Sequence, residues 1–242
     1  MAHYAYFVDL SICAGCESCT VACQNKNELA PNQAFTKVRR FEAGTFPAVT
    51  STFVTTQCMH CDNPPCAEAC PTGATYKEAE GPVTVDTAKC ISCKYCITAC
   101  PYEARVVDED ERVVRKCTMC FDRLQAGQQP ACVQTCLTGA RMAGDLDDPK
   151  SPIHQAIAQA NVHHIEGTSF YYRLPETMGR AVLPADFDGS PATYAWQSIF
   201  QPVGQVMLGG VMGAVLVSLA SNLIQARKKG GDKAHGDHGK GD

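Results

Sequence analysis

Short alternating runs of apolar residues dominate the first half of the chain, which predicts short strands and hairpins. Residues 3–9 have the pattern of a single strand. Residues 33–57 place apolar side chains on both sides of Ala43-Gly44, and residues 102–116 place them on both sides of the acidic run 108–111. We predict one hairpin in each of these two segments.

A long uncharged stretch lies near the other end of the chain. No charged residue occurs from Gly189 to Ala226, and Val203 to Ile224 gives 22 mostly apolar residues, which is the length that crosses a bilayer as a helix. The glycines in this run each cost about 1 kcal/mol in a water-soluble helix, yet glycine is common in membrane helices. We therefore predict one transmembrane helix within residues 199–226. The alternative is a buried helix of a soluble domain.

Two further features of this end bear on the membrane. Gly210, Ala214 and Ser218 recur every four positions, and such a stripe lets a second helix approach closely. We expect this helix to pack against an integral-membrane partner; the alternative is an accident of composition that faces lipid. The tail 227–242 carries five Lys and Arg residues, so the positive-inside rule places the tail in the cytoplasm and the cysteine-rich domain on the extracytoplasmic side of the plasma or inner membrane.

The first residues carry no recognisable targeting segment. They contain neither an apolar signal-peptide core nor a twin-arginine pair. We therefore expect the folded chain to be exported together with a partner that bears the signal; a domain facing the cytoplasm is the alternative. The tail itself is predicted to be polar and disordered.

Between these regions the pattern weakens. Ser151-Pro152 is a typical helix start and predicts a short helix to about Ala160. Residues 161–198 are polar and interrupted by prolines. We expect residues 151–198 to form an irregular strap or linker on a partner subunit, and residues 1–150 to form the main domain.

The spacing of the cysteines identifies the chemistry of that domain. The sixteen cysteines fall into four groups of four, of which two read C-x2-C-x2-C-x3-C, one C-x2-C-x4-C-x3-C and one C-x2-C-x11-C-x3-C. Pro71 and Pro101 directly follow the last cysteines of two groups. A C-x2-C-x2-C-x3-C-P run is the bacterial ferredoxin signature for a [4Fe–4S] cluster, in which the fourth cysteine ligates the other cluster of a pair. We expect the three-residue step to start a helix that carries the fourth thiolate away.

This sharing rule predicts four ligand sets for four [4Fe–4S] clusters, with all sixteen cysteines bound to iron. The groups within residues 58–101 form an inner pair, and residues 1–30 with 117–140 form an outer pair. Set 1 is Cys13, Cys16, Cys19 and Cys136; set 2 is Cys58, Cys61, Cys66 and Cys100; set 3 is Cys90, Cys93, Cys96 and Cys70; set 4 is Cys117, Cys120, Cys132 and Cys23.

Other readings of the cysteines fit less well. Zinc sites usually take two cysteine pairs separated by a longer loop, and disulfide scaffolds suit short secreted chains. The haem motif C-x-x-C-H does not occur in the sequence. The formal net charge is −4, and each oxidised cluster adds on the order of −2, which argues against a nucleic-acid partner. Four basic residues near the clusters either offset that charge or are solvated; they are Arg39, Arg40, Arg115 and Lys116.

Two stretches give the chain a family resemblance. Residues 66–74 read CAEACPTGA and residues 116–123 read KCTMCFDR. With the four cysteine groups, they resemble the four-cluster iron–sulfur subunits of molybdopterin oxidoreductases, over roughly residues 3–150. That family includes the subunits of dimethyl sulfoxide, polysulfide, thiosulfate and tetrathionate reductases and of respiratory formate dehydrogenases.

The resemblance implies an α+β fold of two fused bacterial-type ferredoxin units with hairpin insertions. It implies a relay of single electrons between a large molybdenum- or tungsten-pterin catalytic subunit and a quinone-handling membrane subunit, with no catalytic residue in this chain. The corresponding subunit of a nickel–iron hydrogenase or other quinone-linked complex is the alternative. A redox sensor and an enzyme in its own right are weaker readings, because the sequence has no effector domain, no G-x-G-x-x-G after a strand and no P-loop.

Overall fold

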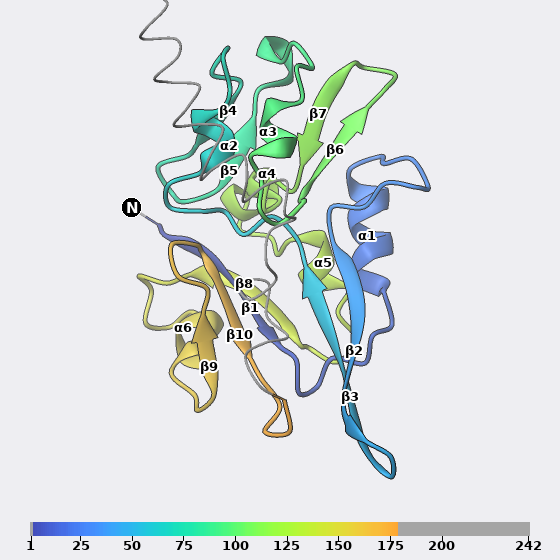
Figure 1. The fold of residues 1–242 in the computed structure, drawn as a ribbon. Coiled ribbons are helices and arrows are strands. Elements are labelled where there is room, and N and C mark those ends of the chain that lie inside the picture. Colours follow the sequence, from blue (N-terminus) through green and yellow to red (C-terminus); the bar gives the residue numbers. More distant parts are fainter. Residues whose placement is uncertain (1, 179–242) are drawn as a thin grey trace, which may run out of the picture. The chain divides into compact units, whose positions relative to one another are not determined.

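We describe residues 2–178 of the computed structural model (Figure 1). Four strands form one mixed sheet in the order β8-β1-β10-β9. They are β1 (Tyr4–Asp9), β8 (Arg141–Asp145), β9 (Val162–His164) and β10 (Phe170–Arg173). Strand β1 runs parallel to β10 and antiparallel to β8, so the predicted strand at residues 3–9 is confirmed and lies inside the sheet.

Alternation along β1 separates two packed faces of this sheet, since successive strand side chains point to opposite sides. Ala5 and Phe7 pack against helix α6 (Pro152–Ile157). Tyr6 and Val8 join a larger core on the other face, together with thiols of sets 1 and 4. One face of the sheet therefore packs against thiols of two predicted cluster sites, sets 1 and 4.

The first predicted hairpin is confirmed, but its turn lies elsewhere. Strands β2 (Lys37–Thr45) and β3 (Ala48–Thr56) pair antiparallel along their whole length, and Figure 1 shows them as one long ribbon. The turn is Phe46-Pro47, whereas Ala43-Gly44 belongs to β2. Proline cannot donate to a strand ladder, which favours the turn at this position.

The second predicted hairpin is also confirmed, with its acidic residues at the turn. It pairs β6 (Arg105–Asp108) with β7 (Val113–Lys116). A shorter hairpin that the pattern did not predict pairs β4 (Thr75–Lys77) with β5 (Val83–Val85), and a 3₁₀ turn at Thr87–Lys89 follows it.

Short helices carry the third cysteine of each group, and in three groups the fourth cysteine lies beyond the helix. They are α1 (Ser18–Lys26), α2 (Pro65–Glu68), α3 (Tyr95–Thr98) and α5 (Ala131–Gln134); α4 (Phe121–Gln125) follows Cys120. The expected helix after the third cysteine is therefore wrong for three groups, in which the helix ends before the fourth thiol. Only α1 continues through its fourth cysteine, Cys23.

Two predictions concern the region after residue 150. The short helix at Ser151-Pro152 is confirmed as α6, which ends at Ile157. The prediction of an irregular stretch is wrong over residues 162–173, because β9 and β10 complete the sheet. No helix within residues 2–178 has the length and apolar character to span a bilayer. The predicted membrane helix at 199–226 and the tail at 227–242 lie outside the described residues.

Candidate iron–sulfur cluster sites

The first three cysteines of each group lie on a loop with a shared backbone feature. The residue directly before the second cysteine has a positive φ in all four groups; these residues are Gly15, His60, Ser92 and Met119, with φ of 66°, 48°, 54° and 62°. A left-handed residue next to right-handed ones turns successive N–H groups towards one point and makes an anion-binding concavity. The loop thus suits a cluster whose thiolates and sulfides are negatively charged.

Two cavities each collect the four thiols of one predicted set. One is lined by Cys58, Cys61, Cys66 and Cys100. The other is lined by Cys70, Cys90, Cys93 and Cys96. These are the members of sets 2 and 3. In each set the fourth thiol comes from the other cysteine group of the pair.

The thiols of sets 1 and 4 influence one another electrostatically. Burial raises the pKa of Cys13, with Cys136 and Cys16 adding to the shift. Burial raises the pKa of Cys23 to about 12, and Cys132 and Cys120 are the next causes. Each fourth cysteine therefore lies close to the other group of its predicted pair.

Neither a single-ion site nor a disulfide is found among residues 2–178. No three His, Cys, Asp or Glu side chains there converge closely enough to hold one metal ion. All sixteen cysteines are free thiols, so no disulfide joins them. Burial raises the pKa of eight of these thiols, which therefore hold their protons without metal. Binding of iron to them releases protons and couples to folding.

Several donors point at the sulfur atoms. The backbone N–H of Val114 donates to Cys90 Sγ (3.4 Å), and that of Met119 donates to Cys117 Sγ (3.4 Å). The Asn27 side-chain amide donates to Cys23 Sγ (3.5 Å). Hydrogen bonds to sulfur are one of the factors that set cluster potentials.

Burial distinguishes the four sets and gives them an order. Sets 1 and 3 each contain one exposed thiol, Cys16 and Cys93 respectively. Sets 2 and 4 meet in a single apolar cluster that contains Cys58 and Cys117, and the pKa of Cys117 is raised by burial, then by Cys23 and Cys58. The thiols of the predicted sets therefore follow the order 1–4–2–3, with a set that contains an exposed thiol at each end and two sets without an exposed thiol between them.

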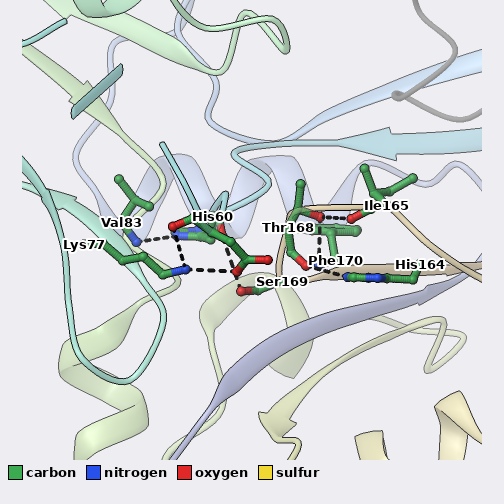
Figure 2. A network of polar contacts seen from close by, with 9 residues as sticks. His60, Lys77, Val83, His164, Ile165, Thr168, Ser169 and Phe170 are labelled. Carbon is green, nitrogen blue, oxygen red and sulfur yellow. Dashed lines mark hydrogen bonds and ion pairs between the residues drawn. The ribbon is translucent and has the colours of Figure 1, made fainter. Parts of the chain in front are cut away.

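A polar network fastens the first loop of set 2 to the sheet (Figure 2). His60 Nδ1 accepts from the Val83 N–H (2.9 Å), and Ser169 Oγ donates to the His60 carbonyl (3.3 Å). Burial, followed by the charges of Lys116 and Lys77, holds the pKa of His60 well below its usual value. A neutral His60 therefore connects this loop to β5 through its side chain and to the segment before β10 through its carbonyl.

The basic residues singled out from the sequence are placed differently from one another. Lys116 is buried and lines the cavity of set 2. Arg115 forms an ion pair with Asp108 (3.0 Å), and Arg40 forms an exposed one with Glu42 (2.6 Å). Arg39 is exposed on β2.

Sequence reasoning missed two buried arginines, Arg105 and Arg141. Each stands five positions after the last cysteine of its group and directly follows an alanine. That repeated C-x3-A-R pattern is the signal that was available to find them.

Comparison with known proteins agrees with this geometry. Two family models, both described as 4Fe-4S dicluster domains, match residues 12–74 and 49–146. A tetrathionate reductase subunit of Salmonella typhimurium is 43% identical over 159 residues, covering 64% of this chain and 63% of that protein. A sulfite dehydrogenase subunit of Allochromatium vinosum is 40% identical, covering 66% of this chain and 75% of the relative. The protein NrfC of Escherichia coli is 39% identical, with 73% and 82% covered.

Fold and site together define a ferredoxin-type iron–sulfur protein built from two dicluster units. The chain belongs to the family of iron–sulfur electron-transfer subunits that includes these tetrathionate reductase and sulfite dehydrogenase subunits. The resemblance drawn from the cysteine groups is thereby confirmed. The chain spans a little under two thirds of the tetrathionate reductase subunit. Which thiols ligate which cluster stays a prediction.

Proposed function

We propose that this chain is the electron-transfer subunit of a respiratory oxidoreductase complex and holds four [4Fe–4S] clusters. When bound, each cluster takes up and releases single electrons. The single observation that carries the proposal is the order 1–4–2–3, in which two sets without an exposed thiol connect two ends that each contain one. The chain's own residues bind the iron, exclude water from the inner sets and donate hydrogen bonds to sulfur.

The partners we propose are a large molybdenum- or tungsten-pterin catalytic subunit and a quinone-handling membrane subunit. Support comes from the names of the relatives, which are subunits of tetrathionate reductase, sulfite dehydrogenase and thiosulfate reductase. A relay of this kind needs no catalytic residue in this chain. The subunit of a nickel–iron hydrogenase is the runner-up, and the catalytic partner that is recovered with the chain separates the two.

We also propose a membrane anchor in residues 199–226, with the cluster domain on the extracytoplasmic side and the tail in the cytoplasm. The support is the 22-residue apolar run and the basic tail after it. Fractionation of cells that produce the full chain, followed by protease treatment of intact spheroplasts, tests both parts. Recovery in the soluble fraction, or protection of the cluster domain from protease, would contradict this arrangement.

The central test is purification of the full chain with its partners under anaerobic conditions. We expect about sixteen irons per chain, electron paramagnetic resonance (EPR) signals of four interacting [4Fe–4S] clusters, and a pterin in the large subunit. Zinc in place of iron, or about eight irons, would overturn the four-cluster proposal. A catalytic partner with nickel in place of a pterin would select the runner-up.

A further inference from the structure

Two buried arginines occupy equivalent places in the two halves of the domain. Arg105 stands five residues after Cys100 and begins β6, and Arg141 stands five residues after Cys136 and begins β8. In both cases the residue three after the cysteine has a positive φ, 49° at Glu103 and 67° at Gly139. This turn reverses the chain after the fourth thiol and directs position five back into the interior.

Arg105 lies between sets 2 and 3. Its side chain is 7% exposed and lines the cavity of set 2. Nη1 donates to Thr75 Oγ1 (3.3 Å), whereas Nε and Nη2 are buried and make no hydrogen bond of good geometry. The Cys66 thiol is close enough to accept from this guanidinium. The thiols whose charge acts most strongly on this guanidinium are Cys66 of set 2 and Cys96 of set 3.

Arg141 lies in the same way between sets 4 and 1. It is 3% exposed, donates through Nη2 to Gln57 Oε1 and stacks over the Tyr6 ring, with Cζ 5.9 Å from the centroid. Nε and Nη1 are buried and have no partner. The thiols whose charge acts most strongly on it are Cys132 of set 4 and Cys19 of set 1.

A buried cation with unused donors is costly unless an anion lies next to it. Within residues 2–178 neither arginine forms an ion pair with a carboxylate. Once iron is bound, the ligand thiolates of the two sets would be the anions beside them, and the cluster would add negatively charged sulfides there. A guanidinium offers donors in several directions, so one arginine is able to serve two clusters at once.

We propose that Arg105 and Arg141 are positioning residues that each fix one positive charge, with free N–H donors, between the two clusters of a pair. The inference rests on the proposed four-cluster function. Reduction adds negative charge to a cluster, so a fixed neighbouring cation favours the reduced state and raises the potential. Each arginine thus sets the potentials of its own pair and leaves the other pair almost unchanged.

The test is an EPR-monitored redox titration of the purified complex that carries Arg105→Gln or Arg141→Gln. We expect the reduced-to-oxidised ratio at a given potential to fall at least tenfold for the two clusters of the affected pair, which is about 59 mV for one electron. Arg105→Gln shifts sets 2 and 3, and Arg141→Gln shifts sets 4 and 1. Arg40→Gln, which removes an exposed arginine paired with Glu42, is the matched control and shifts none.

Arg105→Lys and Arg141→Lys separate charge from the loss of a buried side chain. We expect the shift in cluster potential of each lysine variant to be less than half of the shift of the corresponding glutamine variant. Unchanged potentials in both glutamine variants, or equal shifts in all four clusters, would overturn the inference. About sixteen irons measured in the same samples show that the four-cluster function still holds, so the two failures are distinguishable.

A measurement on the unmutated complex covers the case in which a glutamine variant does not assemble. Arginine labelled with ¹⁵N at the guanidinium is incorporated, and pulsed EPR on the reduced clusters records hyperfine coupling to ¹⁵N. Donation to cluster or thiolate sulfur predicts a resolved coupling that is weakened in the lysine variants. Absence of ¹⁵N coupling in a sample with four intact clusters would refute the proposed placement.

Discussion

The two pairs of cluster sites are built by different means. The contiguous pair, sets 2 and 3, comes from one stretch of residues 58–100 and is shaped by α2, α3 and the three-residue strands β4 and β5. The split pair, sets 1 and 4, combines residues 13–23 with residues 117–136. Its two parts are joined by contacts of α1 with α5 and by the pairing of β1 with β8.

The buried apolar side chains also differ between the two pairs. The aromatic residues Tyr6, Phe170 and Tyr172 are completely buried and belong to the cluster that contains thiols of the split pair. In the contiguous pair, Cys66 and Cys96 pack with Val83, Val114 and the partly buried Ile97, whereas Cys58 and Cys100 pack with Phe35 and Ala104. The completely buried aromatic side chains thus lie beside the pair whose ligands are far apart in the sequence.

The largest expected effect concerns the place where the two pairs meet. Cys117→Ser removes a buried ligand of set 4 that shares its apolar cluster with Cys58 of set 2. We expect more than four of about sixteen irons to be lost and electron transfer through the complex to cease. Cys93→Ser, at an exposed thiol, is the comparison and should lose at most one cluster. Equal iron loss in the two variants would argue against the order of the sets.

The second prediction concerns the packing of the four-stranded sheet against the split pair. Phe170→Ala removes a completely buried ring that lies against Tyr6 and Tyr172, and such a change costs about 3–5 kcal/mol. We expect sets 1 and 4 to lose their EPR signals at lower denaturant concentration than sets 2 and 3. Val83→Ala, in the core of the contiguous pair, should reverse that order with a smaller loss of stability. Simultaneous loss of all four signals in both variants would show that the pairs unfold as one unit.

The contrast between the pairs also explains what the sequence was able to predict. Cysteine spacing is a local signal, so the ligand groups and their crossover could be predicted from the order of residues alone. The strands at 162–173 could not, because β10 is specified by its place beside β1 and not by its own polar, proline-flanked surroundings. The buried arginines were missed for a similar reason: arginine is usually exposed, and only the fold shows which ones face the thiols.

The third prediction compares sets 1 and 3, at the two ends of the order, with sets 4 and 2 between them. Cys16 and Cys93 are exposed, whereas every cysteine of set 4 is buried. Treatment of the anaerobic complex with limited ferricyanide should therefore destroy sets 1 and 3 before sets 4 and 2, because oxidation follows access to the ligand sulfur. Partial iron release followed by EPR measures the order. Earlier loss of an inner set would conflict with the burial pattern.

The smallest expected effect lies on the surface of the split pair. Lys26 on α1 pairs with Asp122 on α4 at 2.9 Å, with side chains 36% and 62% exposed. Burial alone would raise the pKa of Asp122, but its hydrogen bond to Lys26 and the lysine charge lower it. Solvent screening limits such a pair to about 0.2–1 kcal/mol, so Lys26→Met should lower the free energy of unfolding by no more than that.

The sign of the pH dependence follows from the lowered carboxyl pKa. The contribution is present above the unfolded value of about 3.9 and is lost only as the pH falls through the lower folded value. Denaturant titrations between about pH 8 and pH 5 should thus show a constant difference between wild type and Lys26→Met, and about 1 M salt should reduce it. Lys94→Met, which removes a 3.9 Å exposed contact with Glu109 beside the contiguous pair, should cost less. A difference that disappears between pH 8 and pH 5 would point to a titrating partner other than Asp122, and the ion pair would then not be what joins α1 to α4.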